Sequence, residues 1–465
     1  TGNRSPLSDT RSYGRHRHTD TGSYGQCPYS FRHGKPRFTA GSGCGERDVD
    51  MVVTRILATP NAVRATSAQS HGDLGVALYN MGGPQLPGLG HTLPHAARRL
   101  AHPPSIRSWD FLSIALAVFA ADRFVLRSDS PDAWTRTIAL NVELVDPGPW
   151  VVQAQPLADA LRFLSGDIWY LRFHTGGQPP PTFPAQLTDR DCTCLFSGGL
   201  DSLIGVMNLI SAKRRPFIVS QASPKEGVVQ ARLADRLGLK DHRFEGRVIE
   251  RWRAPYEPSS RTRSLLFFAY GTLAASSLGG ELIVPENGLI SINPPLTRRR
   301  LGSLSTRTTH PHFVSSLQMI LNAVGLGVTL VNPYAELTKG EMLAQCQHPQ
   351  INKLAHWSYS CGKGKRLNTQ CGVCVPCLIR RAAFHAAEFK DDTPYHVPTL
   401  AHAATNDDVQ AARLAGAQLA TRNVARWAAE AGPLPTDPVR RGALIDTVRR
   451  GTEELRTYLN SIAWP

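Results

Sequence analysis

The residues with the clearest potential for chemistry form a short run rich in serine and glycine. The run reads S-G-G-L-D-S and comprises Ser197, Gly198, Gly199, Leu200, Asp201 and Ser202. Its two serines supply hydroxyl donors, and its two glycines let the backbone approach a ligand without a Cβ in the way. A helix pattern begins near Asp201, so unpaired backbone N–H groups and the positive end of the helix dipole would meet at this turn. The run therefore predicts a phosphate-binding turn in which Asp201 holds a cation against the phosphates.

A second group of residues suits a metal ion. It consists of four cysteines with the spacing C-x9-C-x2-C-x2-C, namely Cys361, Cys371, Cys374 and Cys377. Four thiolates complete a tetrahedral zinc shell and leave no open position, which is typical of structural sites. An iron–sulfur cluster and free thiols are the alternatives that the pattern leaves open. The group also makes the first motif more specific, because Ser-Gly-Gly alone occurs in ordinary strand-to-helix loops.

Length, charge and cysteine usage limit the class of protein. A chain of 465 residues exceeds what one hydrophobic core usually organises, so we expect two or three domains. The net charge of +15 fits an anionic partner such as a nucleotide or nucleic acid, but the basic residues are scattered in pairs, and an arginine-rich surface explains them equally well. The apolar run at residues 111–121 is too short to span a membrane. The metal-type cysteine spacing, without a secretory signal, favours the cytoplasm.

Composition and periodicity divide the chain into four parts. Residues 1–50 are rich in Gly, Ser, Arg and His, so we expect a disordered leader or a misassigned start. Residues 51–190 are expected to form an N-terminal α/β domain that serves docking or covers the substrate. Its strand candidates are residues 52–57, 76–79, 137–145 and 169–173, and its helix candidates are residues 108–125 and 157–164. Residues 391–465 are expected to be helical, with helices at residues 406–430 and 438–462.

Residues 191–390 alternate between strand-like and helix-like segments. Strands are predicted at residues 193–196, 217–220, 243–248, 281–285 and 327–331, and the later helices at residues 228–237, 264–278, 313–324 and 339–346. This alternation predicts an α/β fold with a doubly wound parallel sheet. Ligands of such sheets bind at the carboxyl ends of the strands, which is where the serine–glycine turn lies.

The two motifs together, in this order, resemble the QueC-type 7-cyano-7-deazaguanine synthases of the PP-loop ATP pyrophosphatase superfamily. The resemblance rests on S-G-G-L-D-S, on C-G-V-C-V-P-C-L-I-R ending at Arg380, and on N-P-Y-A-E-L-T-K-G-E-M at residues 332–342. It covers about residues 191–389. The chain is about twice as long as the housekeeping enzymes, and residues 305–313 replace their Y-P-D-C-R-like loop. In length it is more similar to the QueC-like proteins of bacterial antiphage operons, for which QatC is the nearest name.

The resemblance implies an ATP-dependent enzyme with Mg²⁺ and a structural Zn²⁺. A carboxylate of 7-carboxy-7-deazaguanine type attacks the α-phosphate of ATP, pyrophosphate leaves, and an amine then displaces AMP. In the housekeeping reaction a second ATP converts the amide to a nitrile. The antiphage subgroup adds a partner protein from a defence operon, or a nucleic acid, as a possible acceptor.

The resemblance also implies roles for residues outside the turn. Ser220 and Gln221 lie where the superfamily holds adenine. Arg263, with Arg261, would steady the transferred α-phosphate, and Lys339 would contact a phosphate. A solvated helix start and a surface lysine are the plain alternatives. The remaining candidates are Glu286, Asn287 and Asn293 for the substrate and His310 and His312 for a second metal, although loop histidines seldom bind one.

Two other functions compete with this interpretation. A PP-loop enzyme that modifies tRNA would normally bring an RNA-binding domain or a catalytic cysteine pair, and neither is evident in the sequence. A catalytically inactive scaffold that binds nucleotide within a defence complex is the third hypothesis. Loss of pyrophosphate release on substitution of Asp201 separates an enzyme from a scaffold.

Overall fold

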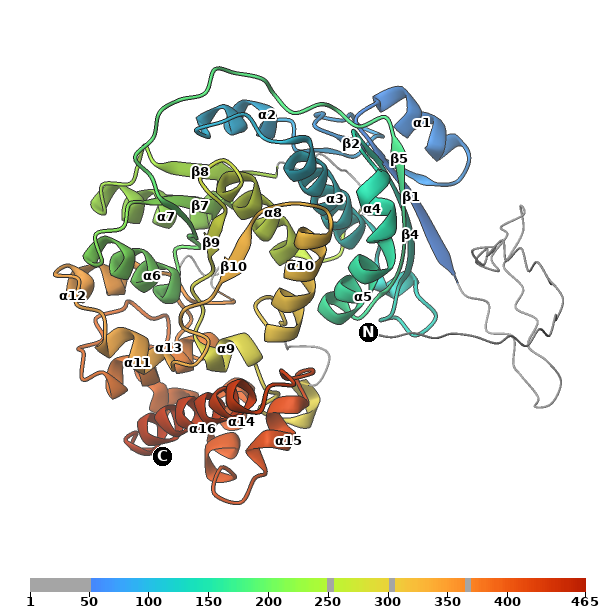
Figure 1. Cartoon of the computed structure of the whole chain (residues 1–465). Helices are drawn as coiled ribbons and strands as arrows, with labels where there is room; N and C mark the ends of the chain where they lie inside the picture. Colours follow the sequence, from blue (N-terminus) through green and yellow to red (C-terminus); the bar gives the residue numbers. More distant parts are fainter. Residues whose placement is uncertain (1–51, 249–254, 301–305, 364–368) are drawn as a thin grey trace, which may run out of the picture. The chain divides into compact units, whose positions relative to one another are not determined.

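The computed structural model describes residues 52–248, 255–300, 306–363 and 369–465 (Figure 1). The expected leader, residues 1–50, lies outside the described residues. The residues from Val52 to Pro465 form one compact unit. This unit is built on two parallel sheets of five strands each, so the predicted α/β class is confirmed.

The first sheet has the strand order β3-β2-β1-β4-β5. Its strands are β1 (Val53–Thr59), β2 (Leu74–Leu78), β3 (Gly88–Leu89), β4 (Thr137–Leu144) and β5 (Ile168–Thr175). Its helices are α1 (Ala62–Ser70), α2 (Leu93–Ala96), α3 (Ile106–Phe124), α4 (Gly148–Val152) and α5 (Ala154–Ser165). The alternating pattern predicted the long strands, and the nearly continuous apolar run predicted α3, which is buried on almost every side. We call this part, residues 52–190, the N-terminal half.

The second sheet has the strand order β10-β9-β6-β7-β8. Its strands are β6 (Cys192–Leu195), β7 (Pro216–Gln221), β8 (Arg243–Gly246), β9 (Glu281–Ile283) and β10 (Thr329–Val331). The chain runs outward from β6 through β7 and β8 and then returns to β9 on the other side of β6, so the winding reverses between β6 and β9. Such a reversal opens a crevice at the carboxyl ends of the two strands. The doubly wound sheet predicted from the sequence is confirmed.

Helices follow the strands of the second sheet, and the alternation predicted each of them except the short helix at residues 288–292. They are α6 (Leu200–Ser211), α7 (Pro224–Arg236), α8 (Arg263–Ala275), α9 (Gly288–Ile292), α10 (Pro311–Ala323) and α11 (Lys339–Ala344). Among the described residues, no helix combines the length and the apolar character needed to cross a bilayer.

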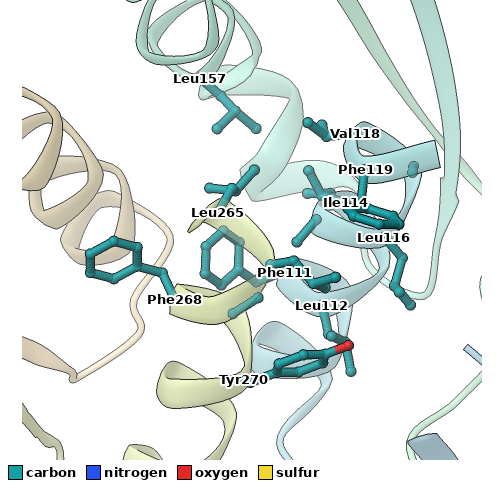
Figure 2. Close-up of a cluster of buried hydrophobic side chains, with 14 of the residues drawn as sticks. Phe111, Leu112, Ile114, Leu116, Val118, Phe119, Leu157, Leu265, Phe268 and Tyr270 are labelled. Carbon is teal, nitrogen blue, oxygen red and sulfur yellow. The ribbon is translucent and has the colours of Figure 1, made fainter. Parts of the chain in front are cut away.

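One hydrophobic core joins the two sheets. Side chains of both halves belong to a single cluster of buried residues. Figure 2 shows part of this cluster, which includes Phe111 and Leu112 of α3 and Leu265 and Phe268 of α8; Phe111 lies beside Leu265 in this view. These four side chains are at most 2% exposed, so the N-terminal half and the second sheet share buried apolar surface.

Helices make up the C-terminal part of the chain. They are α12 (Ile351–Leu354), α13 (Val375–Ala386), α14 (Asp407–Ala417), α15 (Val424–Ala429) and α16 (Pro438–Asn460). The prediction of one helix over residues 406–430 is wrong, because α14 ends at Ala417 and α15 is a separate helix. The side chain of Asn423 accepts a hydrogen bond from the backbone N of Arg426 at 3.0 Å and starts the new helix there.

Glu454 of α16 reaches the first turn of α11. Its carboxylate accepts hydrogen bonds from Oγ1 of Thr338 and from the backbone N of Gly340, the latter at 3.2 Å. Burial raises the pKa of Glu454 to about 7, and the hydrogen bonds from Thr338 and Gly340 oppose this shift only in part. The C-terminal helix is thereby joined to the helix that carries Lys339.

The stability of the protein should depend on pH through Glu454. The pKa of Glu454 in the folded protein, about 7, exceeds the ordinary value of 4.5, so folding is favoured while the group is protonated. This contribution is complete below about pH 4.5 and is lost as the pH rises through about 7. It amounts to at most about 3 kcal/mol of unfolding free energy. Denaturant unfolding at a series of pH values should show the fall in wild-type protein and a flatter profile in Glu454→Gln.

The neighbouring Glu453 offers a matched control. It forms an ion pair with Arg456 at the surface, and the hydrogen bond from Arg456 lowers its pKa. Glu453→Gln should keep the fall in stability as the pH rises through about 7, because the lowered pKa of Glu453 acts only at more acid pH. If Glu454→Gln keeps it as well, Glu454 is not its source.

Candidate active site

The S-G-G-L-D-S turn joins β6 to α6, so the predicted strand–turn–helix is confirmed. Gly198 has a φ of +82°, a conformation that side chains with a Cβ rarely adopt. A Cβ on this residue would lie only 3.1 Å from Cγ of Gln230. Gly199 is the N-cap of α6, and no described side chain caps the helix there. The backbone N–H groups of the first helical turn therefore remain available to an anion.

The two serines of the turn are hydrogen-bonded within it. Oγ of Ser197 accepts from the backbone N of Gly199 at 3.2 Å and lies 3.1 Å from Oγ of Ser202. Ser202 in turn donates to the carbonyl oxygen of Gly199 at 3.0 Å. Leu200 is fully buried in the core of the second sheet and fixes the start of α6. These contacts give the turn a defined shape.

Gln230 of α7 links the turn to the end of β7. Its Nε2 donates to the carbonyl oxygens of Ser197 at 3.0 Å and Gln221 at 3.3 Å. Both partners are acceptors, so the orientation of the amide is determined. The predicted adenine residues lie at this end of β7, where Oγ of Ser220 donates to the carbonyl oxygen of Phe196 at 3.1 Å. The sequence did not single out Gln230, because a glutamine inside a helix carries no motif.

Asp201 forms a buried ion pair with Lys339. The Nζ of Lys339 lies 2.6 Å from Oδ1 of Asp201, and both side chains are at most 7% exposed. Nδ2 of Asn287 donates to the other oxygen, Oδ2, at 2.7 Å. Burial alone would raise the pKa of Asp201, but the Lys339 ammonium and the hydrogen bonds to the carboxylate outweigh it and lower the pKa to about 2. Two residues 138 positions apart in the chain are thus brought together at the start of α6.

Glu286 completes this buried group. It follows β9, on the other side of the point where the winding reverses, and a side-chain hydrogen bond joins it to Asp201. Burial, followed by the negative charge of Asp201, raises the pKa of Glu286 well above its ordinary value. Glu286 therefore holds a proton more readily than Asp201 does. We call Asp201, Glu286, Asn287 and Lys339 the carboxylate–lysine group.

The position of Lys339 follows from local sequence. Thr338 is the N-cap of α11, and its Oγ1 accepts from the backbone N of Glu341 at 3.0 Å. Glu341 reaches back to the backbone N of Thr338 at 2.9 Å, which completes a capping box. The T-K-G-E sequence therefore starts a helix at Lys339 and holds its side chain near Asp201.

The two predicted arginines point to different neighbours. Arg263 is the first residue of α8, and its Nη2 lies 2.5 Å from Oε2 of Glu226 in the first turn of α7. The guanidinium of Arg261 instead lies over the ring of Trp134 in the N-terminal half, 4.7 Å from its centroid. Arg263 is therefore the arginine held beside the carboxyl end of β7.

The four predicted cysteines converge on one point. Their Sγ atoms all lie within 4.8 Å of one another, and all four side chains are buried. The Sγ atoms of Cys361 and Cys374 are 3.7 Å apart, and those of Cys371 and Cys377 are 3.9 Å apart, which is too far for disulfides. A tetrahedral zinc ion with Zn–S bonds of about 2.3 Å places its sulfur atoms about 3.8 Å apart. The geometry of the four cysteines fits zinc.

The cysteine cluster is connected to the serine–glycine turn through the backbone. The backbone N of Tyr359, two residues before Cys361, donates to the carbonyl oxygen of Gly198 at 2.8 Å. Arg380 of α13 is fully buried and donates to Oγ of Ser358 at 2.8 Å. A closed metal site would thus fix the segment that contacts the turn.

The remaining candidates have mainly structural contacts. Nδ2 of Asn293 donates to the carbonyl oxygen of Thr306 at 3.0 Å. His310 is the N-cap of α10 and accepts from the backbone N of His312 at 3.2 Å, and burial lowers its pKa to about 3. Within the described ranges, the four cysteines are the group of possible ligands close enough to share a metal, and the two histidines do not belong to it. The hypothesis of a second metal gains no support from their placement.

Comparison with known proteins places these features in a family. Residues 308–388 match the family model described as Queuosine biosynthesis protein QueC. The chain is similar to the 7-cyano-7-deazaguanine synthase of Sinorhizobium fredii (strain NBRC 101917 / NGR234), with 34% identity over 231 residues, 45% of this chain and 94% of the relative. It is similar to the enzyme of the same name from Rhizobium etli (strain CIAT 652), with 27% identity over 229 residues, 43% of this chain and 89% of the relative.

The family model covers part of the candidate site, and the turn with Asp201 lies outside the matched residues. Lys339 and all four cysteines fall inside residues 308–388. The alignment with the S. fredii protein spans nearly the whole relative but less than half of this chain, so much of this chain is additional to it. On these grounds the chain belongs to the QueC family.

Proposed function

We propose that the protein is an ATP-dependent synthase that adenylates a carboxylate of 7-carboxy-7-deazaguanine type. The observation that supports this most is the carboxylate–lysine group at the N-terminus of α6, where Asp201 lies 2.6 Å from Lys339. An uncapped helix N-terminus attracts the phosphates of ATP, and the group beside it supplies charges that can be rearranged around them. The relatives named 7-cyano-7-deazaguanine synthase support the substrate class.

The proposed reaction proceeds in two displacements. A carboxylate oxygen of the substrate attacks the α-phosphorus of ATP, the bond from that phosphorus to the bridging oxygen breaks, and pyrophosphate leaves with the bonding electrons. An amine nitrogen then attacks the acyl carbon, AMP leaves, and the nitrogen loses a proton. The chemistry depends on placing charged groups, so positioned cations and N–H donors supply most of the rate enhancement.

Each part of the site takes one role in this proposal. The turn holds the β- and γ-phosphates, the end of β7 with Ser220 and Gln221 holds adenine, and Arg263 steadies the α-phosphate through its forked donors. Lys339 exchanges its contact with Asp201 for a phosphate oxygen. Asp201 and Glu286 offer the oxygen ligands that Mg²⁺ prefers, and the ion would neutralise charge on the departing pyrophosphate.

The cysteine cluster would hold a structural zinc ion. Four thiolates leave no open position for substrate, so the ion would contribute to folding and would not take part in the reaction. Its role is to fix the segment whose Tyr359 donates to Gly198.

The wider role proposed here is in bacterial antiviral defence, with a partner protein supplying the amine. The support is the length of this chain, of which about half lies outside the alignments with the curated relatives. A plaque assay on cells that carry the operon with Asp201→Ala tests it. Loss of protection against phage supports the enzyme hypothesis, whereas full protection supports the hypothesis of an inactive scaffold. Mass spectrometry of the co-expressed partner should reveal the added deazaguanine group.

Pyrophosphate release should depend on the Asp201–Lys339 pair. Lys339→Met is expected to lower kcat by about 100-fold or more, because it removes a cation aimed at the phosphates. It also leaves Asp201 buried and unpaired, which costs about 3–5 kcal/mol of stability. The double variant Asp201→Asn with Lys339→Met should recover that stability without recovering activity. Lys353→Met, at an exposed lysine of α12, is the control that should keep both.

Purified protein should contain one zinc ion per chain. Metal analysis after anaerobic purification should find zinc in wild-type protein and in Cys346→Ser, which changes a buried cysteine outside the cluster. Cys371→Ser should lose the metal and unfold at a lower temperature, because metal binding contributes to folding. Equal zinc in the two serine variants would place the metal elsewhere, and iron in place of zinc would identify a different cofactor.

A further inference from the structure

Asp122, on α3 of the N-terminal half, bonds to the segment in front of α8. This side chain is fully buried. Its Oδ2 accepts three hydrogen bonds, from the backbone N of Arg261 at 2.8 Å and from the backbone N and Oγ1 of Thr262 at 2.9 Å each. We call residues 255–262 the lead-in segment, because Arg263 follows it directly as the first residue of α8.

The other oxygen of Asp122 is held by the first sheet. Nη2 of Arg136, at the start of β4, lies 2.6 Å from Oδ1 of Asp122 and 2.6 Å from Oδ2 of Asp167, next to β5. Arg127 also donates to Asp167, at 2.9 and 3.0 Å. These side chains are at most 5% exposed. The position of Asp122 is therefore determined by a buried network of charges inside the N-terminal half.

A second contact holds the beginning of the lead-in segment. Glu257 is 7% exposed, and its Oε2 accepts from the backbone N of Arg127 at 3.1 Å. Its own backbone N donates to the carbonyl oxygen of Arg123 at 2.8 Å. Glu257 and Thr262 are thus both fixed to the N-terminal half, and the residues between them have little freedom to shift.

The held segment leads to a residue of the candidate active site. Thr262 is the N-cap of α8 and Arg263 is its first residue. The guanidinium of Arg263 pairs with Glu226 of α7, and α7 also carries Gln230, which donates to the carbonyl oxygen of Ser197 in the turn. Farther along α8, its apolar side chains pack in the same buried cluster as those of α3 (Figure 2), so the N-terminal half fixes both α8 and its first residue.

We infer that Asp122 is a positioning residue for Arg263, and that the N-terminal half serves the reaction by fixing the lead-in segment. The inference rests on the proposed function, since it takes Arg263 as the residue that steadies the transferred α-phosphate. Asp122 acts only through Arg263 and touches neither nucleotide nor substrate. A displacement of Arg263 by about 1 Å is enough to slow such a reaction substantially.

The chain supplies a matched control on the same helix. Asp110 of α3 is also fully buried, and its carboxylate accepts from the backbone N of Val145 at 2.8 Å and of Asp146 at 2.9 Å. All of these bonds stay within the N-terminal half. Asp110→Asn and Asp122→Asn therefore each replace a buried carboxylate on the same helix, but only Asp122→Asn affects the lead-in segment and the ion pair with Arg136. Thr262→Val changes a bond to the lead-in segment and leaves that ion pair in place.

The first measurement is steady-state pyrophosphate release. Asp122→Asn should lower kcat by about 10-fold or more while KM for ATP changes by less than about twofold, whereas Asp110→Asn should keep the wild-type kcat. In an Arg263→Ala background, Asp122→Asn should have no further effect on kcat, because the two residues act as one unit. Thr262→Val removes one bond to Asp122 and should give a smaller fall of the same kind, in case Asp122→Asn folds poorly.

The second measurement does not need activity. Hydrogen exchange of the amides in residues 255–262 should accelerate in Asp122→Asn and stay at the wild-type rate in Asp110→Asn. Unchanged exchange in Asp122→Asn, or an equal fall in kcat with and without Arg263, would overturn the inference and leave the proposed function intact. If Arg263→Ala alone keeps the wild-type kcat, the role of Arg263 in the proposed function fails, and this inference fails with it.

Discussion

The ion pair between Asp201 and Lys339 is the contact on which the candidate site depends. Neither charge could be buried alone, because an uncompensated carboxylate or ammonium would lose too much solvation energy. At 2.6 Å they compensate each other, and Asn287 occupies the remaining oxygen of the carboxylate. A nucleotide that takes over the ammonium leaves a carboxylate in need of a new cation, which is how the pair couples phosphate binding to metal binding in the proposed function.

The fold explains why these residues meet. Asp201 follows β6 and Glu286 follows β9, and these strands are neighbours although the chain makes two further strands between them. Lys339 is the first residue of α11, whose capped first turn is contacted by Glu454 of the C-terminal helix α16. The N-terminal half accepts hydrogen bonds from the residues directly before Arg263. Parts of the chain far apart in sequence therefore supply the carboxylate–lysine group at the carboxyl ends of β6 and β9.

Local features could be predicted from the sequence, and long-range contacts could not. The glycine turn, the cysteine cluster and the alternation of strands and helices are each encoded within short windows, and the structure has all three. Asp201 and Lys339 were both singled out, but their contact was not, because no local pattern links two residues that are 138 positions apart. Gln230 was missed because a glutamine inside a helix carries no motif. The prediction of a single helix over residues 406–430 was wrong because the surrounding residues all favour a helix and obscure the N-cap at Asn423. The hydrogen bonds that Asp122 accepts from Thr262 leave no signal in the sequence.

In the proposed function, this site cleaves ATP between its α- and β-phosphates when a carboxylate attacks the α-phosphorus. Exchange of radiolabelled pyrophosphate into ATP tests it most directly, because only a reversible adenylation carries the label back into ATP. We expect exchange that requires Mg²⁺ and 7-carboxy-7-deazaguanine together. Release of ADP and phosphate without exchange, or exchange that is the same with and without the carboxylate, would contradict it.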